Sequence, residues 1–120
     1  MIVPEYLRVG YIQRALQLAD VPVTIENIGA IDCIVTHESG WNAAAINLTD
    51  GNAKAGHPSQ GLMQTIPSTF LAHALPNMRN ITAPLDNLVA GIRYSLSRYG
   101  SLLEVPGVIA ISKGHPYCGY

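Results

Sequence analysis

Apolar residues recur at every third or fourth position in three stretches of the chain, a spacing typical of one face of an α-helix. The first stretch covers residues 4–19. The second begins after Thr24, whose hydroxyl suits a helix N-cap, and ends at Gly40, a residue type favoured at helix C-termini. The third and strongest stretch covers residues 84–99. The pattern therefore predicts three principal helices.

The segments between and after these helices are more polar or interrupted. Residues 47–60 are rich in Asn, Asp, Gly, Lys, His, Pro and Ser, which indicates a long loop or a small hairpin. Residues 65–74 can form a short helix with Pro67 in its first turn, and the tail predicts at most one more short helix. The predicted elements are helices, the length of 120 residues is about that of one domain, and the chain has no internal repeat. We therefore expect an all-α fold in a single domain over residues 1–120.

The composition favours a well-formed core and a neutral ligand. Hydrophobic residues make up 48% of the 120 residues and charged residues 12%, about half of the usual fraction of roughly 25%. The formal net charge of −1 provides no broad basic surface, so neither nucleic acid nor an anionic membrane is expected as a partner.

No part of the sequence predicts membrane insertion or a signal peptide. No apolar run reaches the roughly 18 residues of a membrane helix. The first ten residues lack a basic start followed by an apolar run. We therefore expect either another route of export or a chain that is a piece of a larger protein.

The two cysteines, Cys33 and Cys118, match no zinc or redox motif. Whether they pair stays open; a bond would close a loop of about 85 residues and stabilise the fold by roughly 4 kcal/mol. The position of Cys33 within a helix indicates a small buried hydrophobe rather than a nucleophile. No metal is expected, because the four histidines are scattered without paired ligand spacing.

Glu38 lies in the last turn of the second predicted helix, on its apolar face. Partial burial and the negative end of the helix dipole should both raise the pKa of its carboxyl group. A glutamic acid that stays protonated near neutral pH can act as a general acid, for example on a glycosidic oxygen. A frayed surface glutamate is the alternative interpretation of helix position alone.

Three segments occur together in a fixed order. They are Glu38-Ser39-Gly40-Trp41-Asn42, then Gly61-Leu62-Met63-Gln64 followed by Pro67 and Thr69, and finally Asn87-Leu88-Val89-Ala90-Gly91-Ile92-Arg93-Tyr94. In this order they resemble the catalytic domain of soluble lytic transglycosylases, in the lysozyme-like superfamily. The resemblance covers about residues 25 to 110, and the polar insert and the tail are similar to modules of phage tail tape-measure proteins and related secreted cell-wall enzymes.

The resemblance implies a role for three residues and requires no cofactor. Glu38 matches the single catalytic acid, which protonates the oxygen between N-acetylmuramic acid and N-acetylglucosamine and then takes the proton of the muramoyl C6 hydroxyl. The product would be a 1,6-anhydro end. Gln64 is expected to line the sugar cleft, and Tyr94 to bring its hydroxyl near Glu38, unless it is a core tyrosine.

Other cleft candidates have alternatives. Asn47 stands where the family usually has serine, and it is either a cleft residue or a loop-turn residue. Ser59 and Met63 are further candidates for the wall of the cleft, although Met63 also suits core packing. Trp41 either stacks on a sugar or covers the helix end. Asp32 is expected to be a solvated or capping group.

The sequence therefore favours a lysozyme-like lytic transglycosylase that acts on the glycan strands of peptidoglycan, with the long polar loop near the active site. We expect a monomer located outside the cell, in the cell wall or in a virion tail. One alternative is a hydrolytic muramidase of goose type, in which Asp50 would position a water molecule. A second is a non-catalytic, glycan-binding or structural module of a phage tail.

Overall fold

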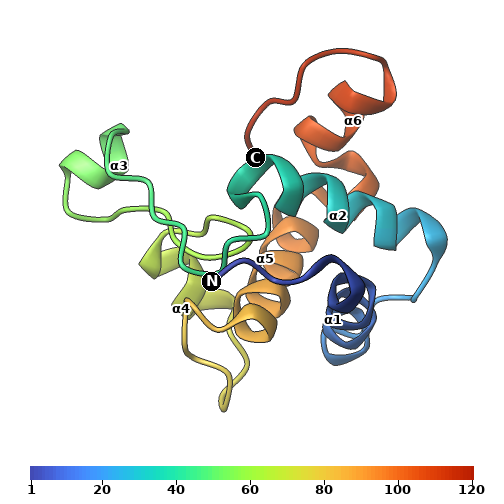
Figure 1. The fold of residues 1–120 in the computed structure, drawn as a ribbon, viewed down its shortest axis with the longest axis horizontal. Helices are drawn as coiled ribbons and strands as arrows, with labels where there is room; N and C mark the ends of the chain where they lie inside the picture. Colours follow the sequence, from blue (N-terminus) through green and yellow to red (C-terminus); the bar gives the residue numbers. More distant parts are fainter.

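The computed structural model describes residues 1–120 and is mainly helical, with no β-strand (Figure 1). The elements are α1 (Glu5–Leu18), α2 (Ile25–Ser39), α3 (Gly51–Lys54), α4 (Pro67–His73), α5 (Pro84–Tyr99), the 3₁₀ turn η1 (Leu102–Glu104) and α6 (Pro106–Ser112). This architecture confirms the all-α prediction. None of the helices combines the length and the apolar character needed to cross a membrane.

The three principal helices lie where the hydrophobic pattern predicts them. At the start of α2 the Thr24 hydroxyl accepts a hydrogen bond from the backbone N–H of Asn27 at 3.1 Å. At its end Gly40 adopts a left-handed conformation with φ of 59°. Helix α5 begins at Pro84 and ends before Gly100, which is also left-handed. Local capping signals therefore fix these boundaries.

The predicted polar loop contains a single-turn helix, α3, rather than a hairpin. The Asp50 carboxylate caps this turn by accepting a hydrogen bond from the Ala53 N–H at 2.9 Å. Isolated bridges join Gln60 to Ile46 and to Thr65, and they close the base of the loop. The loop extends away from the helical body (Figure 1).

Helix α5 lies at the centre of the molecule (Figure 1) and packs against α1 and α4, whereas α2 packs against α1 and α6. Leu88, Val89 and Ile92 of α5 are fully buried. They belong to a cluster of 18 buried apolar residues that also draws on α1 and α2. The N-terminal residues lie beside the end of α2, where the Val3 N–H donates to the Trp41 carbonyl at 2.8 Å.

Candidate active site

Glu38 lies at the C-terminal end of α2 and is half-buried. The Tyr117 hydroxyl donates a hydrogen bond to its Oε2 atom at 2.6 Å. Burial raises the pKa of the Glu38 carboxyl above its ordinary value, although the hydrogen bond from Tyr117 and the nearby His37 partly oppose this shift. The carboxyl group therefore holds its proton to a higher pH than an exposed glutamate does.

Tyr117 reaches Glu38 from the C-terminal tail. Its ring stacks on the His37 ring, with the centroids 4.6 Å apart and the planes 9° from parallel. It also packs against Gly107 in α6, where a Cβ atom would collide with the tyrosine ring. Burial and the Glu38 carboxylate raise the pKa of the Tyr117 hydroxyl, so this group stays protonated and acts as a donor.

The segment 61–64 lies against α2 and α5, and a buried asparagine holds it in place. Gly61 has a φ of 82°, and a Cβ atom there would collide with the Asn87 amide. Asn87 accepts a hydrogen bond from the Met63 N–H at 2.7 Å and donates to the Ile81 carbonyl at 2.8 Å. From α2, the Ser39 hydroxyl donates to the Leu62 carbonyl at 2.7 Å. These bonds fix the segment next to Glu38.

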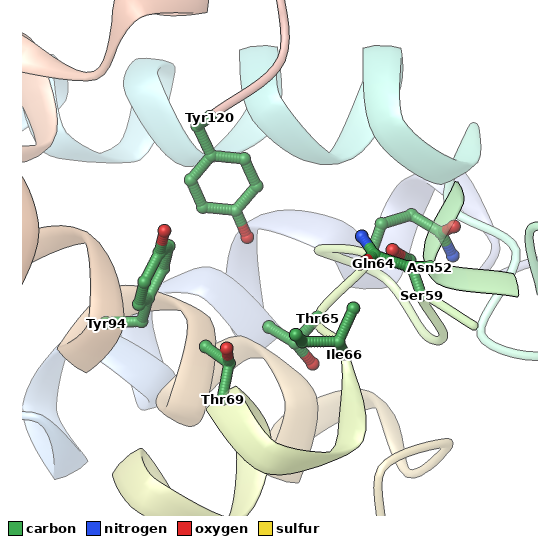
Figure 2. A pocket seen from close by; sticks show the side chains of 8 residues that line it. All are labelled: Asn52, Ser59, Gln64, Thr65, Ile66, Thr69, Tyr94 and Tyr120. Carbon is green, nitrogen blue, oxygen red and sulfur yellow. The ribbon is translucent and has the colours of Figure 1, made fainter. Parts of the chain in front are cut away.

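A pocket of about 170 Å³ opens beside this segment (Figure 2). None of its lining side chains is charged, and all but one carry an amide or hydroxyl group: Asn52, Ser59, Gln64, Thr65, Ile66, Thr69, Tyr94 and Tyr120. The rings of Tyr94 and Tyr120 meet edge to face, with centroids 5.7 Å apart. A neutral ligand rich in hydroxyl and amide groups suits such a lining.

Glu38 is not one of the lining residues, but hydrogen bonds to the segment 61–64 link its surroundings to the pocket. The Tyr120 hydroxyl donates to the Met63 carbonyl at 2.6 Å, next to the Leu62 carbonyl that Ser39 binds. The pKa of Tyr120 is raised by burial and then by the negative charge of Glu38. Tyr120 lines the pocket, and through the adjacent carbonyls of Met63 and Leu62 it is connected to Ser39, which follows Glu38 in the chain.

Three of the predicted cleft residues, Gln64, Ser59 and Tyr94, line the pocket. The Gln64 side-chain N–H groups donate to the backbone carbonyls of Ala45 and Gly61 at 3.0 and 2.9 Å. These bonds leave the amide oxygen free for a ligand. The hydroxyl group that donates to Glu38 belongs to Tyr117 and not, as the sequence predicts, to Tyr94. The Tyr94 ring instead contacts the rings of His73 and Tyr120.

The structure does not bring the other candidates to the pocket. The Asn47 oxygen accepts hydrogen bonds from the backbone N–H groups of Thr49 and Asp50, which is the loop-turn role. Asp50 caps α3 and is not one of the residues that line the pocket. Met63 is fully buried, so it fills the core. Trp41 is also fully buried and donates to an Asp32 oxygen at 3.0 Å, so it covers the helix end and offers no face to a sugar.

Sequence reasoning assigned no role to Tyr117, Tyr120 or Asn87, although Asn87 is the first residue of the third motif. The two tyrosines lie in an irregular tail, 79 and 57 residues from the groups that they bind, so no local pattern marks them. Asn87 had a usable signal, because it is a polar residue among the apolar positions of the amphipathic helix α5 and is fully buried there. A buried polar side chain of this kind needs partners.

Both cysteines are free thiols, Cys33 half-buried and Cys118 exposed. Burial and then the charge of Asp32 raise the pKa of Cys33. Its Sγ atom lies 3.9 Å from Nδ1 of His37. No cluster of three or more histidine, cysteine, aspartate or glutamate side chains is arranged to hold a metal ion.

Comparison with known proteins shows which family and which relative this chain is similar to. Residues 27–111 match the family model described as the transglycosylase SLT domain. The chain is 63% identical over 87 residues to the uncharacterized protein YqbO of Bacillus subtilis (strain 168). That match covers 72% of this chain but 6% of the relative, so the chain spans only a small part of the relative's length. No solved structure matches significantly.

Proposed function

The chain belongs to the transglycosylase SLT domain family, as its three motifs predict, and we propose that it cleaves peptidoglycan glycan strands without water. The bond cut is the β-1,4 linkage between N-acetylmuramic acid and N-acetylglucosamine, and the product carries a 1,6-anhydro end. The observation that carries this proposal is the half-buried Glu38, whose carboxyl group has a raised pKa and one oxygen held by Tyr117.

One carboxyl group is sufficient for this chemistry. Because the Tyr117 hydroxyl donates to Oε2, the acidic proton of Glu38 resides on Oε1. Oε1 gives this proton to the glycosidic oxygen as the bond to C1 breaks. The resulting carboxylate then takes the proton of the C6 hydroxyl while O6 bonds to C1. The proton count balances, and Glu38 returns to its starting state.

The surroundings of Glu38 support this route over hydrolysis. An inverting hydrolytic muramidase needs a second carboxylate to activate water. The carboxylate of Asp50 is engaged at the start of α3, and no aspartate or glutamate lines the pocket. The neutral lining instead suits the hydroxyl and acetamido groups of the two sugars.

The nature of the product tests the proposal. Purified peptidoglycan is digested with the protein, and the soluble muropeptides are analysed by mass spectrometry. We expect 1,6-anhydro products, one water lighter than hydrolysis products. The matched control is Glu38→Gln, which keeps the shape and should lose about 100-fold to 10,000-fold in rate. Released reducing ends that borohydride converts would support the muramidase, and wall binding without release would support a structural module.

We also propose that the chain acts on the wall outside the cytoplasm as one module of a longer polypeptide. The small fraction of the relative that it spans supports this proposal. A virion tail is one setting in which such a module would meet a bacterial wall.

A further inference from the structure

Residues 114–120, here called the C-terminal strap, carry two residues of the site although they follow the part of the chain that matches the family model. The strap has no regular secondary structure. It runs from α6 back to the C-terminal end of α2 (Figure 1). The strap therefore adds a wall to the site that the matched region alone does not provide.

Tyrosine side chains hold the strap in place. From Pro116 onward the strap makes no backbone hydrogen bond to the rest of the protein. Its attachments include the Tyr117 hydroxyl on Glu38, the stack of Tyr117 on His37, and the Tyr120 hydroxyl on the Met63 carbonyl. The Tyr117 ring also packs against Gly107. The bond to Met63 thus anchors the hydroxyl end of the Tyr120 side chain, and the ring lines the pocket.

The pocket has an aromatic side and a polar side. Figure 2 shows the rings of Tyr120 and Tyr94 across the pocket from Asn52, Ser59 and Gln64. An N-acetyl group combines an apolar methyl with an amide that donates and accepts hydrogen bonds, so it matches both sides. The volume of about 170 Å³ is below the roughly 300–1,000 Å³ of sites for larger ligands. One sugar substituent such as an N-acetyl group fits it.

We propose that Tyr120 is a substrate-contacting residue, whose ring forms the aromatic wall of a subsite for an N-acetylated sugar. The proposal rests on the proposed function of the same site and adds a residue and a ligand class to it. Its central claim is that the ring, rather than the hydroxyl bond to Met63, carries the interaction. The strap then contributes to glycan affinity through Tyr120.

The test is direct binding of a neutral tetramer of N-acetylglucosamine, measured by titration calorimetry in the Glu38→Gln background so that no cleavage occurs. We expect Tyr120→Ala to weaken binding about tenfold or more, and Tyr120→Phe to stay within about threefold of its parent. Tyr120→Leu keeps apolar bulk without a ring and should resemble Tyr120→Ala. Tyr6→Ala is the matched control, because Tyr6 is 85% exposed on α1.

Thermal melts of each variant separate a loss of contact from a loss of fold. Full affinity in Tyr120→Ala or Tyr120→Leu, an equal loss in Tyr120→Phe, or no binding by the parent would overturn the proposal. Hydrolytic products in the digestion experiment, with the expected binding losses, would reject the transglycosylase reaction and leave the subsite standing. Anhydro products with unchanged binding would support the transglycosylase reaction and reject the subsite.

Discussion

At the scale of single residues, Glu38 is held where its charged form is disfavoured. Burial raises its pKa, and the Tyr117 hydrogen bond lowers it less than burial raises it. A carboxyl group with a raised folded-state pKa stabilises the fold below its unfolded-state pKa, and this contribution is lost as pH rises through the folded-state value. The property that makes Glu38 a usable acid therefore opposes stability at neutral pH.

Glu38→Gln should consequently stabilise the protein in a pH-dependent way. Glutamine keeps an oxygen that accepts from Tyr117 but never ionises, so it avoids the burial of a charge. We expect the variant to melt at a higher temperature than the parent near pH 7, with the difference shrinking toward about pH 4. Melting curves at several pH values check this. A difference of equal size at both ends of the range would contradict the raised pKa.

The two thiols should differ in reactivity. The pKa of Cys33 is raised by burial and by Asp32, and the thiolate is the reactive form. Cys118 is exposed. We expect iodoacetamide to modify Cys118 before Cys33, as followed by peptide mapping under native conditions. Blocking Cys33 should leave activity nearly intact, and substrate-protected inactivation through Cys33 would place that thiol at the cleft.

At the scale of elements, Asn87 joins α5 to the segment that borders Glu38. Its side chain pairs with the backbone at Met63, Ile81 and Gln60. Asn87→Ala should leave several buried polar groups unpaired and lower the free energy of unfolding by about 3 kcal/mol or more. Urea denaturation measures the change. Asn77→Ala is the control, because Asn77 lies exposed in a turn. Equal effects of the two variants would refute the role of Asn87 in joining α5 to this segment.

The single turn α3 gives Asp50 a role that does not involve water. Asparagine also caps helices, so Asp50→Asn should keep the loop intact. We expect wall-lysis rates within about threefold of the parent, whereas loss of a water-activating base should reduce them about 100-fold or more. Turbidity clearing of isolated walls gives the rates. A large loss with an unchanged melting temperature would restore Asp50 as a catalytic group.

The elements could be predicted more fully than the site because their signals are local. Thr24 and Gly40 mark the ends of α2, and the apolar period marks α5. The contact from Tyr117 to Glu38 spans 79 residues and depends on how an irregular tail folds back. Likewise, the sequence allows Met63 either a wall or a core position. In the structure the Met63 side chain packs against Gly91, and this tertiary contact places it in the core.

At the scale of the whole molecule, the core extends beyond the part that matches the family. The match begins at residue 27, yet Val3, Ile12 and Leu16 are at most 1% exposed and belong to the central cluster. Helix α1 packs against α5, which carries Tyr94. Residues 1–22 are thus part of the packing that positions the site.

Removal of this segment should therefore affect the fold as a whole. Each of Val3, Ile12 and Leu16 contributes about 1.5–3 kcal/mol through burial, and their sum approaches the roughly 5–15 kcal/mol of total stability in small domains. We expect a variant lacking residues 1–22 to lose its cooperative thermal transition.

A single substitution in α1 also tests whether this helix is part of the central core, with a smaller change than a deletion. Leu16→Ala should lower the free energy of unfolding by about 2–5 kcal/mol. Val9→Ala, on the same helix but 52% exposed, should change it by about 0.5 kcal/mol or less. Urea denaturation provides both values. If the shortened variant instead unfolds cooperatively at the temperature of the parent, α1 is an independent addition, and residues 1–120 do not form one domain.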